Sequence, residues 1–199
     1  MKADEAAEFM ERERETNRFK QRAAIAIAFF AMLLAITGLG GQNASKEALN
    51  SNIEASNLFT FFQAKNVRQT SFALAADAFD FAVESNSTLS EAARTGLRNK
   101  SEEYRKTVAR YESEPETQEG KKELLARAKA EEVKRDRALK QDPYFDYAET
   151  LLQIAIVLIS VSIVGEVLWL SFVGGGIGLL GGLLMVNAFL LLVELPYVS

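Results

Sequence analysis

The side chains available for chemistry in this chain are amides, amines, guanidinium groups, hydroxyls and carboxylates, and its 199 residues include neither histidine nor cysteine. Their absence removes most transition-metal ligands, thiol chemistry, disulfide bonds and the commonest general base. Gln63, Lys65 and Arg68 are close enough along a helix to recognise a polar partner together. The alternative is that they pair with acids of a returning helix, such as Glu102 or Glu112.

Other polar residues lie in apolar surroundings. Asp77 and Asp80 form an i,i+3 carboxylate pair without further metal ligands, so we interpret them as solvated or salt-bridged acids. We expect Asn187 to make a hydrogen bond between membrane helices, with a transport role as the alternative. No Walker loop, dinucleotide fingerprint, nucleophile elbow or zinc motif is present. We therefore predict a non-enzymatic protein without catalytic residues, cofactor, metal site or small-molecule substrate.

Long apolar segments determine which elements must position these residues. Residues 23–41 carry no charge, and Leu151–Val193 carries only Glu166. The first segment is long enough for one membrane helix and the second for two. The sequence predicts an all-α integral membrane protein with three transmembrane helices and a long extramembrane antiparallel helical hairpin. The expected segments are a polar N-terminal helix (1–22), transmembrane helices at 23–41, 143–165 and 167–194, and the hairpin (42–142).

The last two spans could be separated at either of two places. A turn at Gly165-Glu166 keeps the carboxylate out of the hydrocarbon, where it would cost roughly 2.5–3.5 kcal/mol. A turn at Gly174–Gly176 would bury Glu166 and suggest ion or proton coupling. We favour the earlier turn. Asp142 followed by Pro143 predicts that a new helix starts there.

The hairpin is predicted from helical periodicity. Residues 42–84 contain no proline or glycine, and an apolar series recurs every seven residues: Ile53, Thr60, Val67, Leu74 and Phe81. A second apolar set comprises Leu58, Phe59, Phe62, Phe72, Ala76 and Phe79. We expect one broad buried face, a turn at 85–88, a capping box from Thr88 to Glu91, and a break near Pro115. A compact three-helix bundle is the alternative.

Small residues mark the expected helix contacts within the membrane. Gly174, Gly178 and Gly182 repeat at four-residue spacing and would allow close helix packing. A second row, at alternating spacings of four and three residues, would form a seam within one protomer or between protomers; alternatively, alanine is simply abundant there. This row consists of Ala24, Ala28, Ala31, Ala35 and Gly38.

The distribution of charge predicts the orientation. Arg18, Lys20 and Arg22 precede the first span, and no basic residue follows the last one. Basic residues near short termini favour the inner side, so we place the N-terminus in the cytoplasm and the hairpin outside. We expect the first apolar segment to be an uncleaved anchor. Residues 42–142 carry seventeen basic and seventeen acidic groups, a balance that does not favour nucleic-acid binding.

Two stretches resemble a bacterial membrane family known only as a domain of unknown function. They are Ala55–Phe59 followed by Gln63, Ala64, Lys65 and Arg68, and Tyr144–Glu149 running into Leu151–Ala155. The resemblance covers roughly residues 20–193 and implies a bacterial membrane protein with one N-terminal and two C-terminal spans. Combined with the charge distribution, it leads us to expect an inner (plasma) membrane protein with a periplasmic hairpin. Asn57 and Phe59 stand where the family has aspartate and tryptophan. The resemblance implies an architecture and no activity.

Three functions are compatible with this architecture. A non-catalytic scaffold or accessory subunit would form a homo-oligomer or brace a larger membrane protein complex. A channel or transporter component would need polar pore-lining residues, and few are available. A sensor-like module would resemble the outer part of a chemoreceptor. We favour the scaffold, with the lipid bilayer and other membrane helices as its partners.

Overall fold

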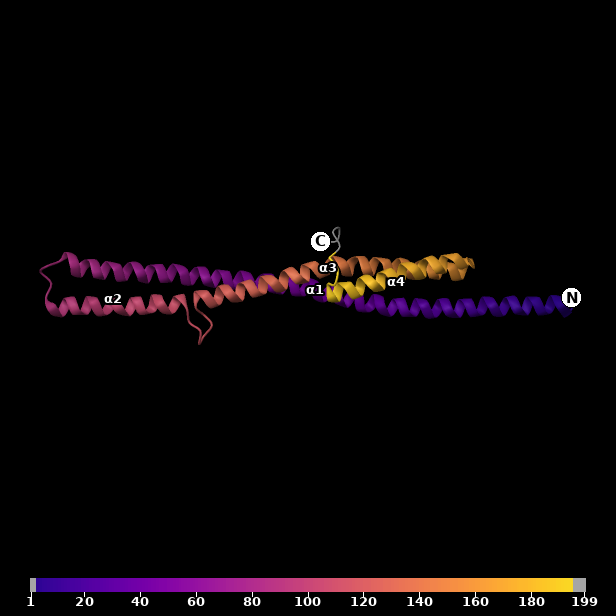
Figure 1. The fold of residues 1–199 in the computed structure, drawn as a ribbon, viewed down its shortest axis with the longest axis horizontal. Coiled ribbons are helices and arrows are strands. Elements are labelled where there is room, and N and C mark those ends of the chain that lie inside the picture. Colours follow the sequence, from indigo (N-terminus) through magenta and orange to yellow (C-terminus); the bar gives the residue numbers. More distant parts are fainter. Residues whose placement is uncertain (1–2, 195–199) are drawn as a thin grey trace. The chain divides into compact units, whose positions relative to one another are not determined.

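The computed structural model describes residues 3–194, so residues 1 and 2 of the predicted N-terminal helix lie outside it (Figure 1). The described range is all-α and contains no strand. Its four helices are α1 (Ala3–Ser85), α2 (Glu91–Glu112), α3 (Lys121–Gly165) and α4 (Leu168–Leu190).

The chain divides into two compact units, and α1 and α3 contribute to both. The apolar unit comprises Met1–Ala48 and Arg137–Ser199, and the hairpin unit comprises Leu49–Asp136. Three helices, namely α1, α3 and α4, are long and apolar enough to cross a membrane. The 23 residues of α4 extend about 34 Å at 1.5 Å per residue, against about 30 Å for a bilayer's hydrocarbon core.

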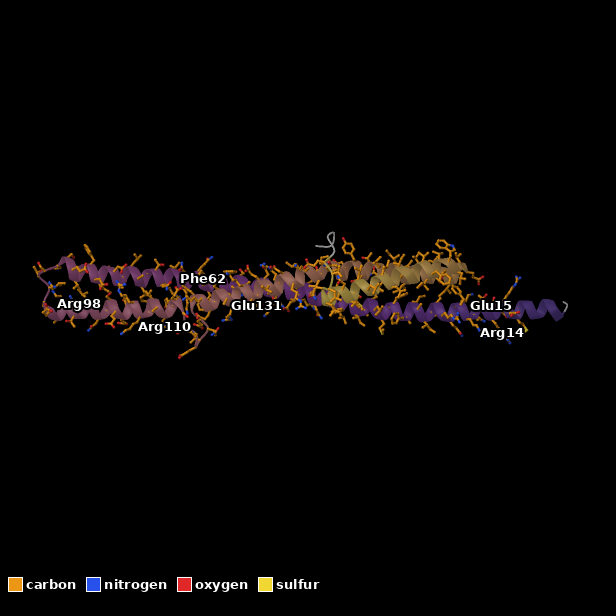
Figure 2. The ribbon with its side chains drawn as sticks, in the orientation of Figure 1. Arg14, Glu15, Phe62, Arg98, Arg110 and Glu131 are labelled. Atoms are coloured by element: carbon orange, nitrogen blue, oxygen red, sulfur yellow. The ribbon has the colours of Figure 1, made fainter. Side chains whose placement is uncertain are left out.

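In the hairpin unit, α2 and the first part of α3 return antiparallel to α1. Arg105 of α2 lies beside Asp77 of α1, whereas Arg135 of α3 lies beside Asn52, nearer the start of this limb. Arg98 and Arg110 follow α2 along its length (Figure 2). The unit is therefore a helical hairpin and not a compact three-helix bundle.

The buried face of this hairpin is not the one expected from the first apolar series. The packed row of α1 repeats every seven residues, and its members are all buried or half-buried: Ser51, Leu58, Lys65, Phe72 and Phe79. Ile53, Thr60, Val67, Leu74 and Phe81 are exposed instead. The two series differ by two residues, which is about 200° around an α-helix, so they occupy opposite faces. The prediction that the first apolar series is buried was therefore wrong, whereas the second apolar set, from Leu58 to Phe79, is buried or half-buried as expected.

The tip of the hairpin differs from the predicted capping box. Helix α2 starts at Glu91, and the Ser90 hydroxyl accepts a hydrogen bond from the backbone N–H of Ala93. Thr88 is not the cap, because its N–H and hydroxyl donate to the side-chain oxygen of Asn86. An Asx turn therefore shapes the reversal, and the cap follows it. The predicted break near Pro115 lies in the loop between α2 and α3.

No helix begins at Asp142, which corrects the expectation placed on Asp142-Pro143. Pro143 lies inside α3, although proline removes one helical hydrogen bond. The Asp142 carboxylate accepts a hydrogen bond of 2.6 Å from the Ser45 hydroxyl on α1 instead of capping a helix. The next residues, Tyr144 and Phe145, are buried against Ala44 and Ala188. Packing against α1 and α4 therefore holds the helix continuous through the proline.

The apolar unit packs α1, α3 and α4 together, and α3 and α4 are separated at Glu166. Glu166 has a left-handed backbone (φ 54°), and its side chain is exposed. The interruption thus falls at the earlier of the two predicted turns, and Gly174–Gly176 are helical. The core of this unit comprises Ala23, Phe30, Leu152, Ala155 and Ile159.

The glycines of α4 do not form a single packing surface for one neighbouring helix. A Cβ added at Gly174 would lie 2.8 Å from Ile159 and 3.1 Å from the Ala155 carbonyl, so this glycine faces α3. A Cβ at Gly178 would lie 2.5 Å from the Phe30 ring, so this one faces α1. Nothing lies within 4 Å of a Cβ at Gly175. The helix thus uses different glycines to approach two neighbours closely.

We predict that Gly178→Ala destabilises the apolar unit by about 1–3 kcal/mol, because the new methyl group must displace a buried aromatic ring. Gly175→Ala is the matched control on the same helix and should be neutral or slightly stabilising, since its methyl group meets open space. Thermal unfolding of both variants in detergent measures the difference. Equal unfolding midpoints would contradict the close contact between Gly178 and Phe30.

Candidate functional site

The first candidate site centres on Lys65, which the packed row of α1 directs inward. Its side chain is only 7% exposed. The ammonium lies 3.5 Å from a Glu114 carboxylate oxygen and 3.9 Å from one of Glu119, and it donates a hydrogen bond to the Glu119 carbonyl. It also lies 5.4 Å from the centre of the Tyr111 ring, within cation–π range. All of these partners are in, or directly before, the loop that joins α2 to α3.

A second group of polar contacts fastens the same loop. Gln69 donates to the Glu112 carboxylate and accepts a 2.7 Å hydrogen bond from Lys121. The Gln69 hydrogen bond and the nearby Lys121 charge lower the pKa of Glu112. Glu123 accepts hydrogen bonds from the Ser113 hydroxyl and the Glu114 N–H, and these contacts lower the pKa of its carboxyl group. Residues at both ends of the loop are thus tied together and to α1.

The structure does not assemble Gln63, Lys65 and Arg68 into one site. Gln63 and Arg68 are exposed, whereas Lys65 is buried and lies about 200° around α1 from Gln63. The alternative expectation, pairing with acids of the return, holds for Lys65, although its partners are Glu114 and Glu119. The seven-residue spacing of Lys65 from Leu58 and Phe72 was the signal in the sequence that could have shown its burial. Its contacts give it a structural role in holding the loop.

The carboxylate pair of the hairpin is salt-bridged, as expected. Arg105 lies 2.9 Å from Asp77 and 2.7 Å from Asp80. The hydrogen bond from Arg105 lowers the pKa of Asp80 below its ordinary value. Across the part of the chain that the structure describes, no group of three His, Cys, Asp or Glu side chains could hold a metal ion.

Glu166 and Asn187, the two polar residues considered for a transport role, both have partners within the chain. Glu166 lies 3.1 Å from Lys20 at the turn between α3 and α4. Asn187 exchanges two 2.9 Å hydrogen bonds with the backbone of Val193. The expected hydrogen bond to another helix is therefore wrong. The left-handed backbone of Leu191 reverses the chain, and the reversal brings Val193 back to the Asn187 side chain at the end of α4.

The outer face of α1 is an uncovered and uncharged surface of the hairpin unit. We define it as nine exposed positions spaced alternately by four and three residues: Ile53, Asn57, Thr60, Ala64, Val67, Ser71, Leu74, Ala78 and Phe81. None is charged, although a quarter of the chain is. The side chains of Val67, Leu74 and Phe81 are 66%, 65% and 70% exposed. This spacing is that of a coiled-coil seam.

The small-residue row of the first apolar segment is also uncovered. Ala24, Ala28, Ala31 and Ala35 are exposed, and Gly38 is half-buried near Glu149. Within this chain α4 contacts α1 elsewhere, at Phe30 and Leu33. The row therefore does not form the seam within the protomer that was one of its two expected roles.

These observations define an all-α protein with three helices able to cross a membrane, whose polar clusters serve internal structure. The chain belongs to the family described as "Domain of unknown function (DUF4337)", whose model matches residues 19–191. The resemblance to an uncharacterised family is thereby confirmed. No curated protein and no solved structure matches the chain.

We predict that Lys65→Met destabilises the hairpin unit by about 1–3 kcal/mol, because Glu114 and the Glu119 carbonyl lose a buried partner. The loop should open more often, which a glutamate-specific protease would report as faster cleavage within residues 113–120. Lys100→Met is the control, since it removes an exposed ion pair with Glu103 and a contact with the Tyr104 ring on the same helix, and neither involves the loop. Equal cleavage rates of the two variants would show that Lys65 does not hold the loop.

Proposed function

We propose that this protein is a non-catalytic membrane scaffold that crosses the bilayer three times and self-associates through its hairpin. Two ion pairs support the proposed placement. Lys20–Glu166 and Lys140–Glu194 lie at the two ends of the paired apolar helices α3 and α4. Charged groups are tolerated at the interfaces and excluded from the hydrocarbon, so the bilayer would lie between these pairs.

The proposed location is a bacterial plasma membrane, with the N-terminus inside and the hairpin outside. Arg18, Lys20 and Arg22 support this orientation, because they lie directly before the first apolar segment. The bacterial source rests on the family resemblance. In this orientation the hairpin unit would extend into the periplasm of a Gram-negative cell.

The observation that carries self-association is the uncovered outer face of α1. A hairpin outside the membrane is surrounded by water, so exposed Val67, Leu74 and Phe81 would each gain from burial. Their exposure follows a heptad spacing, and a partner helix with the same spacing would cover them. A second copy presents such a helix, and two copies anchored in one membrane present it in the same direction. The contact would therefore be a parallel coiled coil.

The flanking polar residues fit this arrangement. With Ala64 and Ser71 at the a positions, Gln63 falls at a g position and Arg68 at the following e position. In a parallel coiled coil the g residue of one helix faces the e residue five positions later on its partner. Gln63 of one copy would thus accept a hydrogen bond from Arg68 of the other. This contact gives the two exposed members of the predicted polar group a role.

The size of the interaction explains why a membrane anchor would matter. Covering the exposed halves of four large apolar side chains on each copy would yield roughly 8 kcal/mol before costs. The loss of translational and rotational freedom on association is of the same order, about 4–15 kcal/mol. Confinement to one membrane raises the effective concentration and reduces that cost. The outer face would then select a partner that is already in the same bilayer.

Cysteine cross-linking tests the proposal directly, because the chain has no native thiol. Ala64→Cys places a thiol in the outer face, and oxidation of membranes containing it should give a disulfide-linked dimer. Lys106→Cys, on an exposed position of α2, is the control and should not cross-link. A dimer from both variants or from neither would argue against self-association through this face. Cross-linking to a different chain would assign the face to a heteromeric complex instead.

Charge substitution gives an independent prediction. Leu74→Glu should shift the protein towards a monomer in detergent, measured by mass photometry or light scattering, because it places two carboxylates in one apolar seam. Val133→Glu is the matched control: Val133 is 69% exposed in the same unit but lies on α3, outside the outer face. An unchanged oligomer in Leu74→Glu would remove the outer face from the interface.

Orientation is tested at the tip of the hairpin. An Asn86→Cys variant carries one exposed thiol in the turn between α1 and α2. A membrane-impermeant maleimide should label it in intact cells. The control is a variant with Arg12→Cys, near the N-terminus, which should react only after lysis. The opposite pattern would place the hairpin in the cytoplasm.

A further inference from the structure

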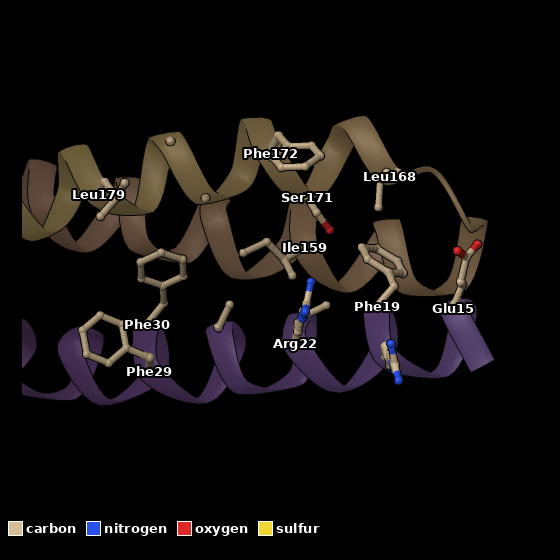
Figure 3. Close-up of a pocket in the computed structure, with 15 residues that line it drawn as sticks. Glu15, Phe19, Arg22, Phe29, Phe30, Ile159, Leu168, Ser171, Phe172 and Leu179 are labelled. Carbon is tan, nitrogen blue, oxygen red and sulfur yellow. The ribbon is translucent and has the colours of Figure 1, made fainter. Parts of the chain in front are cut away.

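A groove in the apolar unit has the features of a lipid site. It has a volume of about 950 Å³ and lies between the first part of α1 and the two helices α3 and α4 (Figure 3). Phe19 and Phe30 point from α1 towards the other two helices, and Leu168 and Phe172 belong to α4. The groove is open along one side, so molecules can enter it laterally from the surrounding membrane.

Two glycines of α4, which have no side chains, shape the groove. Gly175 and Gly176 line it, and a Cβ at either position would meet no atom within 4 Å. Gly174, by contrast, is in close contact with α3. Two of the three consecutive glycines therefore leave space that packing between the helices does not use. A larger side chain at Gly176 would extend from this open position and fill part of the space.

One end of the groove is cationic. Arg18 and Arg22 line it there, together with one acid, Glu15. Nearby Lys20 and Glu166 neutralise each other in their ion pair. Helix α4 begins at Leu168, at the same end, and no side chain caps its first turn. Two guanidinium groups and the positive end of an uncapped helix together favour an anion at this position.

The length of the groove matches one leaflet. Leu168 and Leu179 line its two ends along α4, and eleven residues of helix extend about 16 Å. Half of a bilayer's hydrocarbon core is about 15 Å. Acyl chains lying against Phe29, Phe30 and Leu179 would therefore reach the middle of the membrane, while the phosphate would lie at the level of Arg18 and Arg22.

We propose that this groove binds one anionic glycerophospholipid, with its phosphate on Arg18 and Arg22 and its acyl chains along Gly175 and Gly176. The proposal rests on the membrane placement proposed above, and it is independent of self-association. The apolar length selects a lipid rather than free phosphate. The excess of arginine over acid at the mouth selects an anionic headgroup over a zwitterionic one.

The test uses the full chain reconstituted in nanodiscs containing equal amounts of phosphatidylglycerol and phosphatidylethanolamine. After transfer to mild detergent, native mass spectrometry would count the lipids that stay bound. We expect one phosphatidylglycerol per chain, retained several-fold over phosphatidylethanolamine. Arg22→Gln should lower this ratio about fivefold, the effect of one arginine near a membrane surface. Arg12→Gln, on the same helix but outside the groove, should leave it unchanged.

A groove-filling pair separates the acyl site from the headgroup site. Gly176→Leu should reduce retention of both lipids, whereas Leu180→Phe adds bulk to an exposed face of α4 outside the groove and should not. Circular dichroism would verify that both variants remain helical. Equal retention of the two lipids by the wild-type chain, or no effect of Arg22→Gln and Gly176→Leu, would overturn the site. Extraction of the protein without detergent would instead overturn the membrane placement.

Discussion

The structure depends on the inner row of α1, which keeps one heptad phase from the apolar unit into the hairpin unit. Ala23, Phe30, Thr37 and Ala44 follow one another at seven-residue spacing, and Ser51, Leu58 and Lys65 continue the series. All seven side chains are buried. A row of this period keeps facing its neighbours only if the helix is not interrupted. This constraint accounts for a single α1 of 83 residues through glycines and a polar segment that would weaken an isolated helix.

The same constraint separates what the sequence could predict from what it could not. Helical period, the early turn at Glu166 and the loop at Pro115 follow from residue types and spacing. The buried row of the hairpin does not, because apolar residues occupy both faces of α1 there. The inner row even contains Lys65, whose charge is matched by acids of a loop about fifty residues away. Hydrophobicity alone would place Ile53 inside and Lys65 outside, which is the reverse of the structure.

Local signals failed where other contacts within the chain competed with them. Asp142-Pro143 has the composition of a helix start, yet the Asp142 carboxylate accepts a hydrogen bond from Ser45 instead of capping a helix. The buried side chains of Tyr144 and Phe145 keep α3 continuous across the proline. Asn187 has the composition of a contact between membrane helices, yet its own chain returns to it at Val193. The contact with Ser45 comes from a distant helix, whereas the contact with Val193 comes from the turn that ends α4. The sequence therefore predicted the elements better than the partners of their polar side chains.

The two uncovered apolar surfaces differ in what must cover them, and this difference decides their proposed partners. Ile25, Phe29 and Leu39 lie on the exposed side of the first apolar segment, where lipid would be the solvent. Lipid tails are as apolar as these side chains, so moving the side chains from lipid into a protein contact would gain little free energy. Val67, Leu74 and Phe81 are as exposed on the hairpin, where the solvent would be water. In the proposed placement only the second group would gain from leaving its solvent, so we assign the proposed protein partner to the hairpin and the proposed lipid to the groove between α1 and α4.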